Sequence, residues 1–192
     1  MQNKSDNELM RLVIQRKAEA LKYLYYRYEH QIFNFIYRYT GCRELAQDLL
    51  QETFTRVWFA AHTFGRKKGS FKGWLFTIAL NLTRSEMARK QYAYQYTEIS
   101  DVQNTGLEPV HPRQEQPDIQ AENTDLKKMI FKALGELPSF LREIIVLKHY
   151  QQLKFREIAE ITKIPEGTLK ARFHRAINRL EEILRGYGMD GF

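Results

Sequence analysis

The chain has 192 residues, of which 43% are hydrophobic and 13% aromatic, so it can form one domain or two small ones with real cores. This composition excludes global disorder. Lys and Arg number 30 against 23 Asp and Glu, which gives a formal net charge of +7. A basic excess of this size favours an anionic partner only if it is localised along the chain.

The charge is indeed localised, in two blocks. Residues 1–92 hold 16 basic and 8 acidic residues, and residues 126–185 hold 13 and 7. The stretch between them, 93–125, holds seven acids and a single base, Arg113. Two basic blocks flank an acidic connector, which predicts two modules that face a polyanion and a joining segment that does not.

The hydrophobic pattern predicts an all-α fold. Apolar residues recur at spacings of three and four in both blocks, and no strand-like alternation persists. We expect helices at 7–16, 18–39, 43–62, within 71–90, and at 126–136, 139–152, 155–162 and 165–185. The stretch 93–125, with three prolines, predicts a flexible linker. The expected domains are therefore 1–92 and 126–192, two small helical units joined by 93–125.

The helix expected at 43–62 has a polar face that carries large apolar residues. Asp48, Glu52 and Thr55 lie opposite the apolar stripe, but Leu49 and Phe59 interrupt them. Two interpretations stay open. Either this face contacts a partner, or Leu49 and Phe59 pack against a neighbouring helix.

The segment 71–90 interleaves cations with aromatic residues. Trp74 follows Lys72 closely, and Arg84, Arg89 and Lys90 come within a few helical turns. Cations hold phosphates while aromatic rings stack on unpaired bases, so this composition favours single-stranded nucleic acid. The alternative is that Trp74, which opens the apolar run WLFTIAL, is mainly a packing residue.

The last helix is amphipathic in an unusual way. At about 100° per residue, Leu169, Phe173 and Ala176 form an apolar stripe. The nearly opposite face carries Lys170, Ala171, His174, Arg175 and Asn178. The break before this helix has the length of a helix-turn-helix connection, whose second helix enters the DNA major groove. Helical hairpins without a DNA role are common, so the opposed cationic face is what favours DNA.

No pattern of enzyme chemistry is present in the sequence. The histidines show no metal-ligand spacing, Cys42 is the single cysteine, and no phosphate-cradling glycine loop occurs. We therefore expect no catalytic residue, no metal site and no cofactor. A lone cysteine fits a reducing compartment, and no stretch resembles a signal peptide or approaches the ~20 apolar residues of a membrane span. We expect a cytoplasmic protein.

Four stretches carry a family resemblance. They are AEALKYLYYRYEHQIFNFIYRYTG, AQDLLQETFTRVW and GSFKGWLFTIALNL in the first block, and LPSFLREIIVLKHYQQLKFREIAEITKIPEGTLKARFHRAINRL in the second. In this order they resemble the bacterial RNA polymerase sigma factors of the extracytoplasmic-function (ECF) group of the sigma-70 family, which keep the second and fourth conserved regions. The resemblance implies a transcription initiation factor that binds core RNA polymerase and directs it to promoter DNA.

The resemblance also implies a role for particular residues. On DLLQE, the polymerase contacts would be Asp48, Gln51 and Glu52. The single-stranded minus-10 element would meet Lys72, Trp74, Asn81, Arg84, Arg89 and Lys90. Among these, Asn81 matches the asparagine at the loop that accepts a flipped base, although taken alone it reads as a helix cap. The minus-35 duplex would meet Lys170, Ala171, His174, Arg175 and Asn178.

Four positions depart from the family pattern. Ser85 stands where an acidic residue is common, and Ala88 stands in place of the first arginine of the usual run. Lys154 replaces a helix-capping serine, and Leu169 stands where valine is common. Many relatives are held inactive by an anti-sigma factor, often membrane-bound, so the resemblance implies such a partner as well. The rival interpretation is a two-domain DNA-binding regulator that does not replace a sigma factor. It shares the helix-turn-helix but gives no role to DLLQE.

Overall fold

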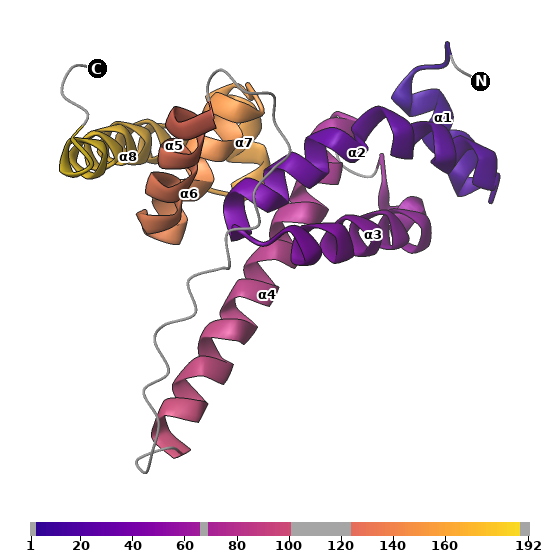
Figure 1. Cartoon of the computed structure of the whole chain (residues 1–192). Helices are drawn as coiled ribbons and strands as arrows, with labels where there is room; N and C mark the ends of the chain where they lie inside the picture. The colour runs from indigo at the N-terminus through magenta and orange to yellow at the C-terminus, as the bar shows by residue number, and fades with distance from the viewer. Residues whose placement is uncertain (1–2, 66–68, 101–123, 189–192) are drawn as a thin grey trace.

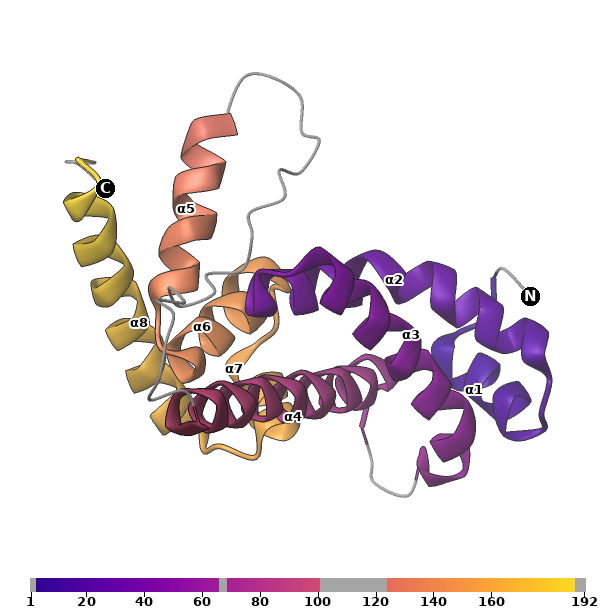
Figure 2. The ribbon, with the colours of Figure 1, turned by 60° about the horizontal axis from the view of Figure 1, so that its bottom comes forward.

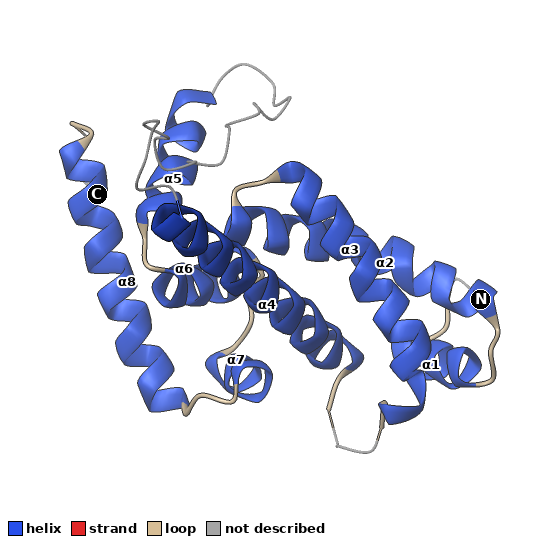
Figure 3. Cartoon of the chain, turned by 90° about the horizontal axis from the view of Figure 1, so that it is seen from below, coloured by secondary structure: helices blue, strands red, loops and turns tan. Residues whose placement is uncertain are grey.

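The computed structural model describes residues 3–65, 69–100 and 124–188. Within those ranges all regular structure is helical, which confirms the all-α prediction (Figure 3). The first block forms α1 (Asp6–Ile14), α2 (Ala18–Thr40), α3 (Arg43–Ala60), a short 3-10 helix η1 (Ala61–Thr63) and α4 (Phe71–Ser100). The second forms α5 (Thr124–Glu136), α6 (Ser139–Ile145), a π-helical extension η2 (Val146–Tyr150), α7 (Phe155–Thr162) and α8 (Glu166–Gly186).

Local sequence explains where several helices begin and end. At α1 the Ser5 hydroxyl accepts a hydrogen bond from the Glu8 backbone N–H at 3.3 Å, and the Glu8 carboxylate accepts one from the Ser5 N–H at 2.7 Å. This reciprocal pair is a capping box. At α7, Lys154 cannot supply the hydroxyl, but the Glu157 carboxylate still accepts from its backbone N–H at 2.7 Å. Gly41 ends α2 in the left-handed region, with φ of 73°.

The main difference from the expected elements is the length of α4. This helix runs to Ser100, past the end expected for the first domain at residue 92. The added residues, AYQYTEIS, contain neither Gly nor Pro, so nothing in them stops a helix. The C-terminal end of the expected linker, 93–125, overlaps the start of α5 at Thr124. Residues 101–123 lie outside the described part of the chain.

In the first domain α2 is the central helix. Its buried side chains include Leu24, Ile32, Phe35 and Ile36, and α1, α3 and α4 all pack against it (Figure 1). The ring of Phe35 meets that of Phe76 on α4 edge to face, with centroids 5.6 Å apart. Contacts of this kind add about 0.5–1.5 kcal/mol to the burial of apolar area. This core fixes the directions in which α3 and α4 present their outer faces.

The second domain is built from α5 to α8. Ile144, Ile158 and Leu169, one each from α6, α7 and α8, belong to its buried core. Phe155 of α7 packs edge to face against Phe173 of α8 at a centroid distance of 5.8 Å. Lys163 adopts a left-handed backbone, with φ of 62°, at the turn between α7 and α8. The helix-turn-helix predicted from the sequence is therefore present.

The two domains pack against each other. Helix α4 contacts α7, and α2 contacts α5, α6 and η2. Figure 2 shows α4 reaching from the first domain along the second, while α8 lies on the side of the second domain that is far from α1. The domains thus form one body in which the outer face of α8 stays accessible.

Candidate nucleic-acid interface

The outer face of α8 is the clearest candidate for DNA contact. The five residues expected at the minus-35 element are all exposed on one side of this helix: Lys170, Ala171, His174, Arg175 and Asn178. The opposite side holds Leu169 and Ala176 fully in the core, with 1% and 0% exposure. Burial of that side fixes the rotation of the helix, so the exposed side is presented to solvent as a unit.

Local contacts hold the first turn of this surface. The Lys170 ammonium lies 3.1 Å from the Glu166 carboxylate, one turn earlier on α8. It also lies 6.0 Å from the ring centroid of Phe155 on α7. Both groups of the ion pair are about half exposed, so water and salt weaken it. A phosphate or guanine edge can therefore replace Glu166 as the partner of Lys170 at little cost.

The six residues expected at the minus-10 element all lie on α4, but they do not share one face. Trp74 and Asn81 differ by only about 20° around the helix axis. Arg84 and Arg89 lie on either side of Asn81, by about 60° and about 80°. The remaining two, Lys72 and Lys90, lie about 180° from Asn81. Composition grouped the five cationic and aromatic residues and the family resemblance added Asn81, whereas one unbroken helix separates the two lysines from the rest.

Asn81 is exposed in the middle of α4. It is therefore neither in a loop nor at a helix cap, and both of these expectations were wrong. The reason is that no helix breaker occurs between Trp74 and Lys90, so α4 continues through this position. An exposed amide on a helix can still donate to and accept from a base edge.

Arg84 is engaged within the protein. Its guanidinium donates from Nε to Glu143 Oε2 at 2.8 Å and from Nη2 to Glu143 Oε1 at 2.7 Å. This is a bidentate pair of the geometry that arginine also uses for phosphate. The Glu143 side chain is only 7% exposed and that of Arg84 is 37% exposed. Arg84 is thus tied to the second domain rather than presented to solvent with Asn81.

Trp74 is partly packed against neighbouring rings and partly accessible. Its ring lies 5.4 Å from that of Phe64 and 6.1 Å from that of Phe71, measured between centroids. The side chain is partly buried. Trp74 therefore does pack, as one interpretation expected, and it also keeps some accessible surface.

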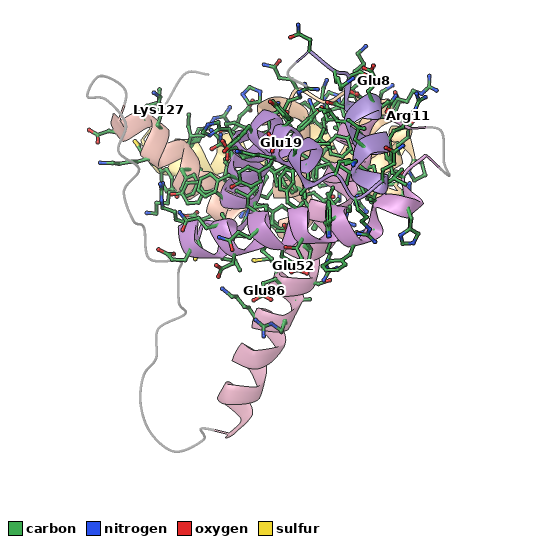
Figure 4. The ribbon with its side chains drawn as sticks, turned by 90° about the vertical axis from the view of Figure 1, so that its right-hand side faces the viewer. Glu8, Arg11, Glu19, Glu52, Glu86 and Lys127 are labelled. Carbon is green, nitrogen blue, oxygen red and sulfur yellow. The ribbon has the colours of Figure 1, made fainter. Side chains whose placement is uncertain are left out.

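The outer face of α3 carries the residues expected to meet the polymerase. Asp48 and Gln51 are exposed, and the partly exposed Glu52 pairs with Arg56 at 2.8 Å. Figure 4 shows Glu52 on α3 and Glu86 on α4 at the lower edge of the body. Leu49 is buried, at 8% exposure, whereas Phe59 is 66% exposed. Of the two apolar residues that interrupt this face, Leu49 packs and Phe59 does not.

Phe59 lies nearly in line with the acidic residues of α3. It is three helical turns after Asp48, about 20° away around the axis. Asp48, Gln51, Glu52 and Phe59 therefore form one outer surface, which we call the α3 face. An aromatic ring bordered by charged and polar groups is typical of a protein interface.

The described residues contain neither a metal-binding cluster nor a membrane-spanning helix. No group of three or more His, Cys, Asp or Glu side chains there is placed to hold a metal ion. Among the helices of that same part of the chain, none is both long and apolar enough to cross a membrane.

Comparison with known proteins identifies the family. Residues 24–92 match Sigma-70 region 2, and residues 127–180 match Sigma-70, region 4. These two regions, in this order on two helical domains, define a sigma-70 transcription initiation factor. The chain belongs to the extracytoplasmic-function (ECF) group of this family, and it is a promoter-specific transcription initiation factor.

Individual relatives agree with this assignment. The ECF RNA polymerase sigma factor SigW of Bacillus subtilis is 32% identical over 166 residues, covering 82% of this chain and 85% of SigW. The RNA polymerase sigma factor YlaC of the same organism is also 32% identical, covering 86% of this chain and 91% of YlaC. Among solved structures, the sigma factor RpoE of Bartonella quintana, crystallised with the anti-sigma factor NepR, superposes with a TM-score of 0.68 at 27% identity. This superposition covers 85% of this chain and 96% of RpoE.

Proposed function

We propose that α8 reads the minus-35 duplex of the promoter while α4 holds the minus-10 element as a single strand. The observation that carries this proposal is the outer face of α8, where five exposed residues lie opposite a fully buried seam. On that face Arg175 and Lys170 bind guanine edges or phosphates, and Ala171 allows close approach to a thymine methyl. His174 and Asn178 complete the contact.

On α4 the structure favours a smaller binding set than the sequence did. Trp74 and Asn81 lie in line and both have accessible surface, so we propose that they stack on and hydrogen-bond unpaired bases. Arg89 flanks them and contacts the backbone of the strand, and Arg84 joins when it is released from Glu143. Lys72 and Lys90, on the opposite side of the helix, contribute to the general field or contact another segment of DNA.

We further propose that the α3 face binds core RNA polymerase. Asp48, Gln51 and Glu52 suit a basic partner surface, and Phe59 adds an apolar anchor that becomes buried in the complex. Residues 1–92 then bind the polymerase and the minus-10 element, and residues 126–192 bind the minus-35 element. The acidic segment 93–125 joins them and, by family analogy, passes near the active-site cleft of the polymerase.

Two partners and one compartment follow from this role. Core RNA polymerase and promoter DNA are the working partners, and transcription places the protein in the cytoplasm. We also propose an anti-sigma factor, soluble or membrane-bound, because the similar RpoE is found in complex with NepR. The mechanism is binding and strand capture, so the chain needs no catalytic residue, metal or cofactor.

Run-off transcription with purified core polymerase tests this function. DNA fragments upstream of the protein's own gene serve as templates, and new start sites are expected only when both chain and polymerase are present. Copurification with core polymerase separates the proposal from a DNA-binding regulator, which would bind the fragments but not the enzyme. Absence of both association and altered start sites would refute the proposal.

The acidic segment can be tested in the same assay. If it imitates nucleic acid near the cleft and is displaced by nascent RNA, replacing its acids with amides will change the ratio of abortive to full-length transcripts. An unchanged ratio would contradict this role.

A further inference from the structure

The end of α2 makes three consecutive contacts with the second domain. The ring of Tyr37 lies 4.9 Å from that of Phe131 on α5, measured between centroids. The Arg38 guanidinium lies 4.3 Å from the ring centroid of Tyr150 in η2. The backbone carbonyl of Tyr39 accepts a hydrogen bond from Nη1 of Arg142 on α6 at 2.7 Å. This run combines apolar, cation–π and hydrogen-bonding contacts, so it specifies one arrangement of the domains rather than loose contact.

A polar cluster lies beside these contacts. The Tyr39 side chain is 3% exposed, and its phenol pKa is raised to about 12 by burial and by the nearby Glu143 carboxylate. Arg84 reaches Glu143 from α4, and Arg142 also donates to the carbonyl of Leu137 at 3.0 Å. The cluster thus joins α2 and α4 of one domain to α6 of the other. Arg84 and Glu143 bond each other across the domain boundary, and Arg142 donates across it to the Tyr39 carbonyl.

The pairing of Arg84 with Glu143 connects residues 59 positions apart in the chain. Because Glu143 is almost fully buried, its carboxylate needs this guanidinium to offset the loss of water. The pair also uses the two adjacent donors with which Arg84 would grip a phosphate. In the closed body the Glu143 carboxylate therefore uses the two Arg84 donors that a phosphate would need.

We propose that Glu143 and Arg142 form an intramolecular latch that holds the free chain closed and withholds Arg84 from promoter DNA. Opening the latch releases Arg84 to a phosphate of the minus-10 strand, so that Glu143 and DNA compete for one guanidinium. This second part rests on the proposed role of α4. Both domains belong to one chain and meet at an effective concentration on the order of millimolar, so modest contacts suffice to keep the body closed.

The first experiment measures closure in the free chain without polymerase or DNA. Donor and acceptor dyes are attached to cysteines introduced at two exposed positions, Glu19 on α2 and Arg185 on α8, in a Cys42→Ser background. Glu143→Gln removes the charge but keeps the size of the side chain. We expect it to lower the energy transfer, with a roughly tenfold increase in the ratio of open to closed chains, the size associated with one charged hydrogen bond.

Two further variants keep this test decisive. Glu160→Gln removes a carboxylate whose nearest partner, Arg156, is on the same helix, so it should leave the energy transfer unchanged. Arg38→Ala removes a different contact between the domains, the stack on Tyr150, and should also lower the energy transfer. This variant replaces Glu143→Gln in the test if Glu143→Gln fails to fold. Unchanged energy transfer in a folded Glu143→Gln chain would overturn the latch, and so would unchanged transfer in Arg38→Ala if Glu143→Gln does not fold.

The second experiment tests competition for Arg84. Binding of a fluorescein-labelled single-stranded oligonucleotide of mixed sequence to the free chain is compared between the original protein and Glu143→Gln. We expect tighter binding by a factor of about three to ten, since a phosphate contact is gained, and we expect Arg84→Ala in the same chain to abolish the gain. Equal binding despite reduced energy transfer would overturn the competition with DNA. The energy transfer does not involve polymerase, so it distinguishes failure of the latch from failure of the sigma function.

Discussion

Replacing Phe59 with alanine is expected to weaken binding to core RNA polymerase by about 30-fold. A phenylalanine that is fully buried at an interface removes roughly 150–250 Å² from water. Two thirds of the Phe59 side chain is exposed in the free protein, with a value of 66%, so a partner can cover on the order of 130 Å². At about 25 cal/mol per Å² this corresponds to about 3 kcal/mol. Alanine retains part of that area, which leaves a loss of about 2 kcal/mol.

The assay is equilibrium binding of the labelled chain to purified core polymerase, followed by fluorescence anisotropy. Thermal unfolding should be nearly unchanged, because Phe59 makes few contacts to lose in the free protein. Tyr26→Ala is the matched control, since Tyr26 is a similarly exposed aromatic, at 59%, on α2 rather than on the α3 face. Phe59→Leu should recover most of the affinity. If Phe59→Ala bound polymerase as tightly as the original chain, the α3 face would not be the polymerase contact.

Three further outcomes are expected. Arg175→Ala should reduce promoter binding by roughly 1–3 kcal/mol if Arg175 reads a base; an equal loss on all DNA sequences, measured by competition, would show a phosphate contact instead. Asn81→Ala should slow promoter opening, followed with permanganate or a fluorescent base, while polymerase affinity stays the same; lost affinity would contradict this role. The pKa of the Tyr39 phenol is raised to about 12. The protonated phenol therefore stabilises the fold fully below the ordinary tyrosine pKa near 10, and this stabilisation is lost as the pH rises through about 12. Tyr39→Phe should therefore flatten the dependence of unfolding on pH between 10 and 12, and an unaltered profile would contradict the assignment.

Much of the fold was predictable because each helix carries its own signals. The capping pair of Ser5 and Glu8, the left-handed Gly41 and the apolar stripe from Leu169 to Ala176 are local features. The outer face of α8 followed from the same periodicity, because a helix with one buried stripe has only one side left for solvent. Its expected roles stay predictions for the binding experiments.

The arrangement of residues on α4 was harder to predict from the sequence. The family resemblance grouped Lys72 and Lys90 with Asn81, but the helix is unbroken and places them on opposite sides. The exposure of Phe59 was one of two interpretations left open by the pattern. Only the packing of α3 decided that Leu49 turns inward while Phe59 stays in solvent.

The sequence by itself determined the helices, the two basic blocks and the exposed face of α8, because these depend on spacing within one segment. Tertiary structure alone decided that Arg84 meets Glu143 and that Arg142 meets the end of α2, contacts that join residues 59 and 103 positions apart. No local pattern encodes such pairs, since an arginine and a glutamate on two helix surfaces look the same whether they face water or each other. Their meeting depends on how two separately folded cores dock, and that docking is what ties a predicted DNA-binding residue to the opposite domain.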